Sequence, residues 1–162
     1  MKKKAQQSIG MSFGMIFAIF LIVIFVLVAF FAIKAFLDIG ESSQVGLFYE
    51  DLQDAIDDAW QSQSTEKTFE IDLPSGITHI CFANLSDSIR GDSDFYDDIK
   101  DFYLYNANVF LIPPGEAEGL KYNSLEHINL AKITYYENPY CVPVAQGLKI
   151  EKGFYDRLVV IE

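Results

Sequence analysis

The sequence predicts an α+β protein in which a long N-terminal helix, transmembrane and then amphipathic, is packed by a mainly antiparallel β-sheet domain. Three observations support this class. No charged residue occurs from Ala5 to Ile33, a run of 29 residues. The segment that follows repeats apolar residues at helical spacing, and from Thr65 the apolar residues alternate with polar ones as they do in strands.

The uncharged run is predicted to cross a membrane as a helix, which we assign to residues 6–34. About 20 apolar residues suffice to span a bilayer core, and a soluble helix is not apolar on every side over such a length. Lys2–Lys4 precede the run and only Lys34 follows it closely. Because the end richer in Lys and Arg stays in the cytoplasm, we expect a cytoplasmic N-terminus and an extracellular domain over residues 35–162.

A cleaved secretory signal peptide is the alternative for this segment. Such a peptide has an apolar region of about 7–15 residues, followed by small residues at the cleavage site. The run here is about twice as long as that, and nothing similar to A-x-A precedes Lys34. The pattern therefore favours a retained membrane anchor.

The residues at the start of the anchor form a motif that consists of Lys2-Lys3-Lys4-Ala5 followed by Gln6-Gln7-Ser8-Ile9-Gly10. This motif resembles the class III signal of archaeal type IV pilin-like proteins, in which a prepilin peptidase cuts after Gly or Ala and often before Gln. The resemblance implies cleavage between Ala5 and Gln6, with residues 1–5 as the leader. Bacterial type IV pilins usually carry Glu where this chain has Gly10, so the resemblance is to the archaeal proteins.

The resemblance implies a structural role, as a pilin-like subunit or minor pilin of an archaeal surface filament whose core is built from the apolar helices. It also implies membrane lipid, a prepilin peptidase and the pilus assembly machinery as partners. The whole chain is similar to single-span proteins of small-genome archaea that share this start. Gly10 and Gly14 share one helix face, which would permit close helix approach and self-association, although Gly is common in membrane helices in general.

Residues 35–64 are predicted to continue the helix as an amphipathic stalk. Apolar residues recur there at positions i, i+3, i+4, i+7, i+11, i+14 and i+15: Val45, Phe48, Tyr49, Leu52, Ile56, Ala59 and Trp60. Such a stripe is typical of a helix that covers a core. Residues 38–43 are more polar and indicate either a break, with Ser43 as a helix cap, or a soft spot in one long helix.

Residues 65–162 are predicted to form the β-rich domain. Thr68–Leu73 and Ile77–Phe82 alternate with period two around the turn signal Pro74-Ser75-Gly76, so we expect them to pair as a hairpin. Five further strands are expected: Asn108–Ile112, His127–Thr134, Tyr140–Val144, Leu148–Glu151 and Leu158–Ile161. One face of the resulting sheet would pack on the apolar stripe of the stalk.

The charge of the extracellular part limits its partners. Residues 35–162 contain 8 Lys or Arg and 23 Asp or Glu, which gives a formal net charge of −15, compared with −11 for the whole chain. Nucleic acid binding needs a basic surface, so we expect no nucleic acid partner. A charge of this sign is typical of a soluble surface domain.

Cys81 and Cys141 are the only cysteines. Two cysteines in an oxidising compartment most often pair, so we expect a disulfide; the alternative is two buried thiols that pack as small apolar groups. His79 shares a strand face with Cys81, but a zinc site needs four ligands and His127 is the only other histidine. We therefore expect no metal site there.

The segment 87–101 is rich in aspartate around Gly91 and could bind calcium loosely. An EF-hand loop that starts at Asp92 would need Gly at its sixth position and Glu at its twelfth, and the chain has Asp97 and Tyr103 there. A solvated acidic loop is the favoured interpretation. We expect no cofactor.

Asn84-Leu85-Ser86 matches the N-glycosylation sequon, which makes Asn84 a candidate modification site in an external domain. No nucleophilic triad, phosphate-binding glycine loop or acid–base pair is readable, so we expect no enzymatic activity. The alternative function is a single-pass, membrane-anchored extracellular binding domain that does not polymerise.

Overall fold

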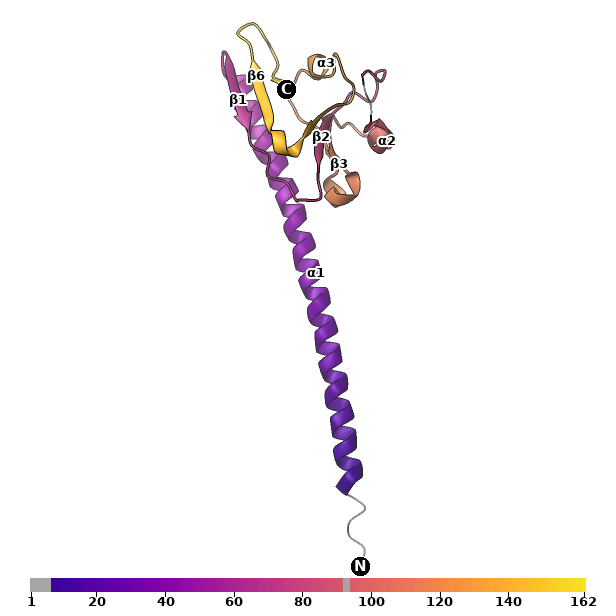
Figure 1. Ribbon diagram of the computed structural model, residues 1–162. Helices are drawn as coiled ribbons and strands as arrows, with labels where there is room; N and C mark the ends of the chain where they lie inside the picture. Colours follow the sequence, from indigo (N-terminus) through magenta and orange to yellow (C-terminus); the bar gives the residue numbers. More distant parts are fainter. Residues whose placement is uncertain (1–6, 92–93) are drawn as a thin grey trace, which may run out of the picture. The chain divides into compact units, whose positions relative to one another are not determined.

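The computed structural model describes residues 7–91 and 94–162, and the chain divides into two compact units, residues 1–40 and 41–162. Helix α1, Gln7–Gln61, is a single element of 55 residues (Figure 1). Residues 38–43 lie inside this helix, so Ser43 does not cap a second helix. The predicted leader and the Ala5–Gln6 junction lie outside the described residues.

The second unit, which we call the head (residues 41–162), contains the end of α1 and all the strands. The other elements are β1 Thr65–Phe69, β2 His79–Phe82, α2 Tyr96–Ile99, η1 Lys100–Phe102, β3 Val109–Ile112, η2 Pro114–Leu120, β4 Tyr122–Asn123, α3 Leu130–Ile133, β5 Tyr140–Pro143, η3 Val144–Gln146, β6 Leu148–Lys152 and β7 Val160–Ile161.

The strands form two antiparallel sheets, with the orders β1-β6-β7 and β4-β3-β2-β5. This arrangement confirms the α+β class with a mainly antiparallel sheet domain. The predicted hairpin is wrong: β1 pairs with β6, and β2 pairs with β3 and β5. A turn does form after Pro74, whose carbonyl accepts the amide of Ile77 at 3.0 Å, but it leads from one sheet to the other. Alternation identifies a strand and leaves its partner undetermined.

The predicted strand His127–Thr134 is also wrong. Only Ile128 makes a strand-like bridge, to Val159, and the following residues form the short helix α3. The side chain of Asn129 accepts the amide of Lys132 at 3.1 Å and so caps that helix. Asn is a preferred N-cap residue, and this cap competes with extension of the strand. The C-terminal strand β7 does pair with β6, as the apolar chain end predicts.

The core of the head forms where the stripe of α1 meets both sheets. Six of the seven stripe residues are buried: Val45, Phe48, Tyr49, Leu52, Ile56 and Ala59. They pack in one cluster with Ile80 of β2 and Ile150 of β6. Trp60 differs from the expectation, because 39% of it is exposed.

The four-stranded sheet is buried on both faces. Along β2, Ile80 and Phe82 belong to the cluster around α1, whereas Cys81 belongs to a second cluster with Phe110 and Ile99. This alternation follows from the period of two in a strand. Residues of α2 and η1 pack in this second cluster, so the segment after residue 94 covers the outer face of the four-stranded sheet.

The C-terminal end of α1 is held by a lysine from β6. Lys152 Nζ donates hydrogen bonds to the carbonyl oxygens of Trp60 and Ser62, the latter at 2.7 Å. The last carbonyls of a helix lack partners within the helix, and a cationic donor satisfies them favourably. The end of the helix is thereby tied to the three-stranded sheet.

We predict that Leu52→Ala lowers the free energy of unfolding by about 2–5 kcal/mol, because it leaves a cavity beneath both sheets. Leu52 is fully buried, whereas Leu47, one turn earlier, is 58% exposed. Leu47→Ala is the matched control and should change stability by no more than about 0.5 kcal/mol. Urea titration of the detergent-solubilised full chain, followed by the fluorescence of Trp60, measures both. Equal losses in the two variants would contradict this description of the core.

Candidate functional site

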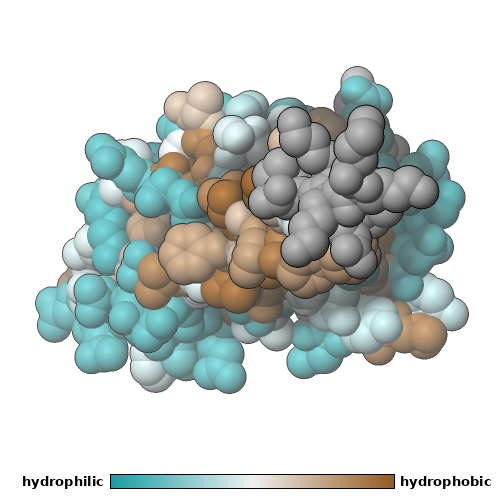
Figure 2. All heavy atoms as spheres, turned by 90° about the horizontal axis from the view of Figure 1, so that it is seen from below, coloured by the Kyte–Doolittle hydropathy of each residue, from teal (hydrophilic) through white to brown (hydrophobic). Residues whose placement is uncertain are grey.

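The most extensive exposed apolar surface lies on the first half of α1. Every residue from 13 to 37 is exposed in the isolated chain, and we call this stretch the apolar segment. Figure 2 shows hydrophobic side chains gathered over this helix. Among the described residues, α1 is the one helix that is long and apolar enough to cross a membrane. Its side chains require a cover of lipid or of other protein, since water disfavours so large an apolar surface.

The two predicted packing glycines both lie in α1. A Cβ atom added at Gly14 would meet no atom within 4 Å. The chain itself therefore gives Gly14 no packing role within the described residues. A glycine on a membrane helix allows another helix to approach closely. Self-association through this face therefore stays a prediction.

The predicted disulfide is confirmed. Cys81 and Cys141 lie directly opposite each other on β2 and β5, with their Cα atoms 4.0 Å apart, and their sulfur atoms are bonded. Disulfides form and persist in oxidising compartments. A bond of this kind is typical of domains that fold in an oxidising compartment.

His79 takes part in packing. Its Nδ1 lies 3.0 Å from the hydroxyl of Thr78, and its ring lies 4.5 Å from that of Phe95, centroid to centroid. No group of three or more His, Cys, Asp or Glu residues that could hold a metal ion occurs in the described part of the chain.

We predict that the double variant Cys81→Ala, Cys141→Ala loses about 4 kcal/mol of stability, because the bond closes a long loop in the unfolded chain. The two cysteines are 60 residues apart. Chemical denaturation of the purified chain, with and without reductant, measures the loss. Reductant should destabilise the native chain and leave the double variant unchanged. A native chain insensitive to reductant under denaturing conditions would contradict the prediction.

A group of ring and polar contacts joins the end of α1 to the loop before α3. The rings of Trp60 and His127 stack 3.8 Å apart, centroid to centroid, with an angle of 3° between their planes. His127 Nδ1 lies 2.8 Å from Asp57 Oδ1, and that same oxygen accepts Gln53 Nε2 at 2.8 Å. Gln53 Oε1 accepts the amide of Glu126 at 2.9 Å. The sequence placed Trp60 in the core, but its ring instead covers His127.

The electrostatics of this group of contacts favour an ionised carboxylate. Two hydrogen bonds hold the pKa of Asp57 below its ordinary value, and the one from His127 has a larger effect than the one from Gln53. A carboxyl group with a lowered pKa in the folded state stabilises the fold above its unfolded pKa. That contribution to stability is lost as the pH falls through the pKa that the carboxyl group has in the folded state.

We predict that Asp57→Asn destabilises the head at pH 6, by less than about 1 kcal/mol because the pair is partly exposed to solvent. The difference from the native chain should shrink as the pH falls below about 4. Thermal unfolding between pH 3 and pH 7 measures it, with the exposed Asp54→Asn as the control. A difference that grows towards low pH would have the wrong sign for this account.

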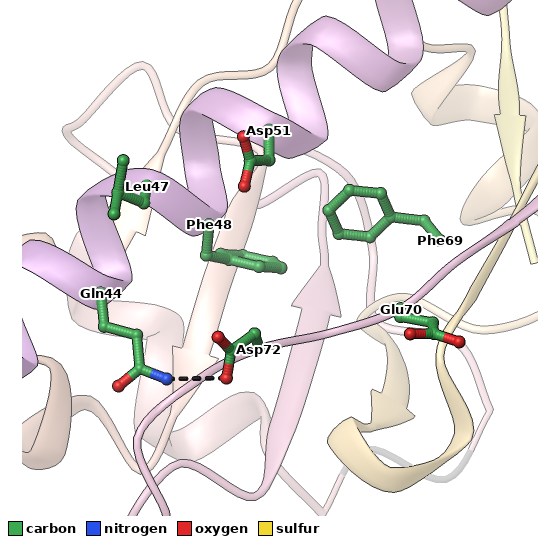
Figure 3. A pocket seen from close by; sticks show the side chains of 7 residues that line it. All are labelled: Gln44, Leu47, Phe48, Asp51, Phe69, Glu70 and Asp72. Atoms are coloured by element: carbon green, nitrogen blue, oxygen red, sulfur yellow. Dashed lines mark hydrogen bonds between the residues drawn. The ribbon is translucent and has the colours of Figure 1, made fainter.

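Figure 3 shows a small groove between α1 and the chain that follows β1. It has a volume of about 120 Å³ and carries the carboxylates of Asp51, Glu70 and Asp72. Gln44 Nε2 donates to Asp72 Oδ1 at 2.8 Å. The aromatic rings of Phe48 and Phe69, 6.1 Å apart, supply apolar surface beside these acids. The groove therefore combines negative charge with a small apolar wall.

The described part of the aspartate-rich segment forms local ion pairs. Asp87 Oδ2 accepts Arg90 Nη1 at 3.0 Å, and Asp97 Oδ1 accepts Lys100 Nζ at 2.7 Å. The backbone amide of Ser88, and then Arg90, hold the pKa of Asp87 below its ordinary value. Asp92, where an EF-hand loop would begin, lies outside the described residues.

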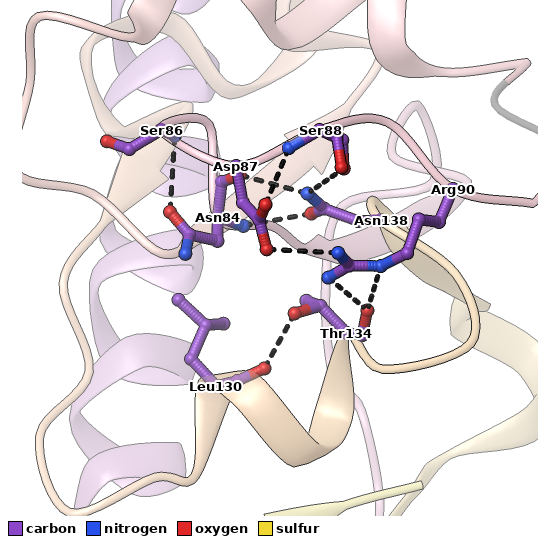
Figure 4. A network of polar contacts seen from close by, with 8 residues as sticks. All are labelled: Asn84, Ser86, Asp87, Ser88, Arg90, Leu130, Thr134 and Asn138. Carbon is purple, nitrogen blue, oxygen red and sulfur yellow. Dashed lines mark hydrogen bonds and ion pairs between the residues drawn. The ribbon is translucent and has the colours of Figure 1, made fainter.

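Asn84 lies at the end of β2 in a polar network (Figure 4). Its Oδ1 accepts the amide of Ser86 at 3.1 Å. The backbone amide of Asn84 donates to Asn138 Oδ1 at 3.0 Å. Asn138 Nδ2 in turn donates to the backbone carbonyl oxygens of Asn84 and Ser88, at 2.9 and 3.1 Å. Asn138 is 3% exposed. The sequence around it does not reveal this role, because Asn before Pro is also common in ordinary turns.

Arg90 closes the same network. Its Nε and Nη2 donate to the carbonyl oxygen of Thr134 at 3.3 and 3.0 Å. An open cleft of about 520 Å³ lies beside this network, lined by Asn84, Asp87, Arg90, Ala131 and Tyr135. The structure thus joins the sequon to the residues around α3, a connection that the sequence does not reveal.

The chain matches no family model, no curated protein and no solved structure. Its function has to be inferred from its own features. These are the apolar segment, the disulfide-bonded head and the polar surface around Asn84.

Proposed function

We propose that this chain is a pilin-like structural subunit or minor pilin of an archaeal surface filament, anchored in the membrane by its N-terminal helix before assembly. The observation that carries the proposal is the continuity of α1 from the apolar segment into the buried stripe of the head. One helix thus joins a surface that requires an apolar environment to a folded, acidic domain.

The length of the apolar segment fits this role. At about 1.5 Å per residue, residues 13–37 extend over about 37 Å, which exceeds the ~30 Å of a bilayer core. A longer helix has to tilt, protrude or pack against other protein. Because the segment is apolar on all sides as far as Ile33, lipid can cover it before assembly and neighbouring helices can cover it afterwards.

The motif before the apolar segment supports processing. A simple anchor has no need for Gln6-Gln7-Ser8 at this place, whereas a prepilin peptidase would cut between Ala5 and Gln6. The three lysines also favour a cytoplasmic N-terminus, which would leave the head outside the cell. An external head agrees with the Cys81–Cys141 bond. Membrane lipid, the peptidase and assembly machinery are then the partners, together with further copies of the chain.

The charge of residues 35–162 limits the partners of the chain and the way in which copies can assemble. Residues 35–162 carry a formal net charge of −15, which disfavours binding to nucleic acid or to anionic lipid. Like charges on neighbouring heads repel, and at 0.1 M ionic strength salt screens this repulsion at distances beyond about 10 Å. Assembly should therefore depend on the helices and be aided by salt.

Mass spectrometry of the N-terminus of the native, membrane-extracted chain tests the proposal. We predict a chain that begins at Gln6. The variant Ala5→Leu should keep residues 1–5 and fail to enter filaments, because the peptidase requires a small residue before the cut. Leu47→Ala, far from the junction, is the control and should be processed normally.

A native chain that keeps Met1 or Lys2 would overturn the processed-subunit proposal. A chain that begins near residue 34 would identify the helix as a removed signal peptide. Both results distinguish processing from simple anchoring without requiring that filaments be found first.

The second candidate function is a non-polymerising, membrane-anchored binding domain. One observation favours it: an open cleft of about 450 Å³ between α3, β5 and β7, lined by residues that include Lys132, Tyr136, Tyr140 and Glu162. It combines aromatic surface with both charges, as small-ligand sites often do. This candidate requires an intact leader and single chains in the membrane, so the same N-terminal measurement separates the two.

A further inference from the structure

We propose that Asn84 carries an N-linked glycan, and that the first sugar of this glycan lies in the cleft beside Asn84, against the ring of Tyr135. The inference depends only on an external head, which both candidate functions share. It assigns to this surface a covalent modification by an oligosaccharide.

The hydrogen bonds of Asn84 described above do not use its side-chain nitrogen, Nδ2, which is the atom that a glycan would modify. Its Oδ1 accepts the amide of Ser86, and its backbone amide and carbonyl are both bonded to Asn138. Nδ2 takes part in none of these contacts. A glycosylated amide keeps its carbonyl oxygen as an acceptor, so attachment at Nδ2 preserves the whole network. The hydroxyl group that the sequon requires belongs to Ser86, which is exposed.

The neighbouring cleft has the side chains that a sugar-binding site needs. Tyr135 is 65% exposed and presents an aromatic ring on which the C–H face of a sugar can pack. Asp87 and Arg90 border the same cleft and provide polar groups for hydroxyls. The cleft measures about 520 Å³ and begins at Asn84 itself, so an attached sugar needs no spacer to enter it.

The reaction requires a lipid-phosphate-linked oligosaccharide as donor and a membrane transferase. The new bond joins Nδ2 of Asn84 to the anomeric carbon of the sugar. The bond between that carbon and the phosphate oxygen breaks, and the lipid phosphate leaves with its electron pair. One proton is lost from Nδ2 to a base of the transferase. No oxidant or reductant takes part.

Peptide mass spectrometry of the full chain from native cells tests the modification. We expect a glycan mass on the peptide that contains Asn84, absent in Ser86→Ala and retained in Ser86→Thr. Ser86→Ala keeps the backbone amide of residue 86, which donates to Asn84 Oδ1, so the variant removes the sequon without removing this contact. The same digest, kept unreduced, reports whether Cys81 and Cys141 are joined.

An unmodified Asn84 in a chain with the oxidised cysteine pair would overturn this proposal while the external head remains supported. An unmodified Asn84 in a chain with both thiols free would overturn it and the external placement together. A modified Asn84 supports the attachment whether or not the chain forms filaments.

Hydroxyl-radical footprinting tests the sugar-binding site. Oxidation of Tyr135 should be several-fold lower in the glycosylated chain than in Ser86→Ala, because the sugar covers the ring. Tyr155 is the control: it is 95% exposed and does not line this cleft, so its oxidation should not change. Equal oxidation of Tyr135 in both chains would contradict the sugar-binding site.

Discussion

The packing of the α1 stripe against both sheets is the interaction on which the rest of the head depends. Leu52 and Ile56 are fully buried, and their cluster includes residues from β2, β3, β5, β6 and β7. Within residues 7–91 and 94–162 the two sheets share no paired strands, so this common core joins them. Lys152 and the His127–Asp57 contact then fix the end of the helix to the strands and loops around it.

This packing gives the apolar segment its functional meaning. The second half of α1 is part of the head core, and the apolar segment continues from it along the same helix. The head itself presents an acidic surface. The polar face around Asn84 and the cleft beside β5 and β7 are the parts of that surface with distinct chemistry.

Much of the fold was predictable from local patterns. Helical spacing predicted the buried stripe, short runs rich in apolar residues located β2, β3, β5 and β6 closely, and the two cysteines predicted their own bond. Pairing was not predictable, because alternation in β1 fits any antiparallel partner and β6 lies far along the chain. The Asn129 cap made α3 where a strand was expected. The contact of Trp60 with His127 and the role of buried Asn138 depend on tertiary neighbours, so no local signal reveals them.

Electron cryomicroscopy of surface filaments from the native organism tests the central claim most directly. The account predicts filaments in which this chain is a subunit, with its apolar helices packed together at the centre and its acidic heads outside. Density that traces residues 13–37 against neighbouring copies would establish the assembly. Recovery of the chain only as single molecules in lipid, absent from every filament, would contradict it.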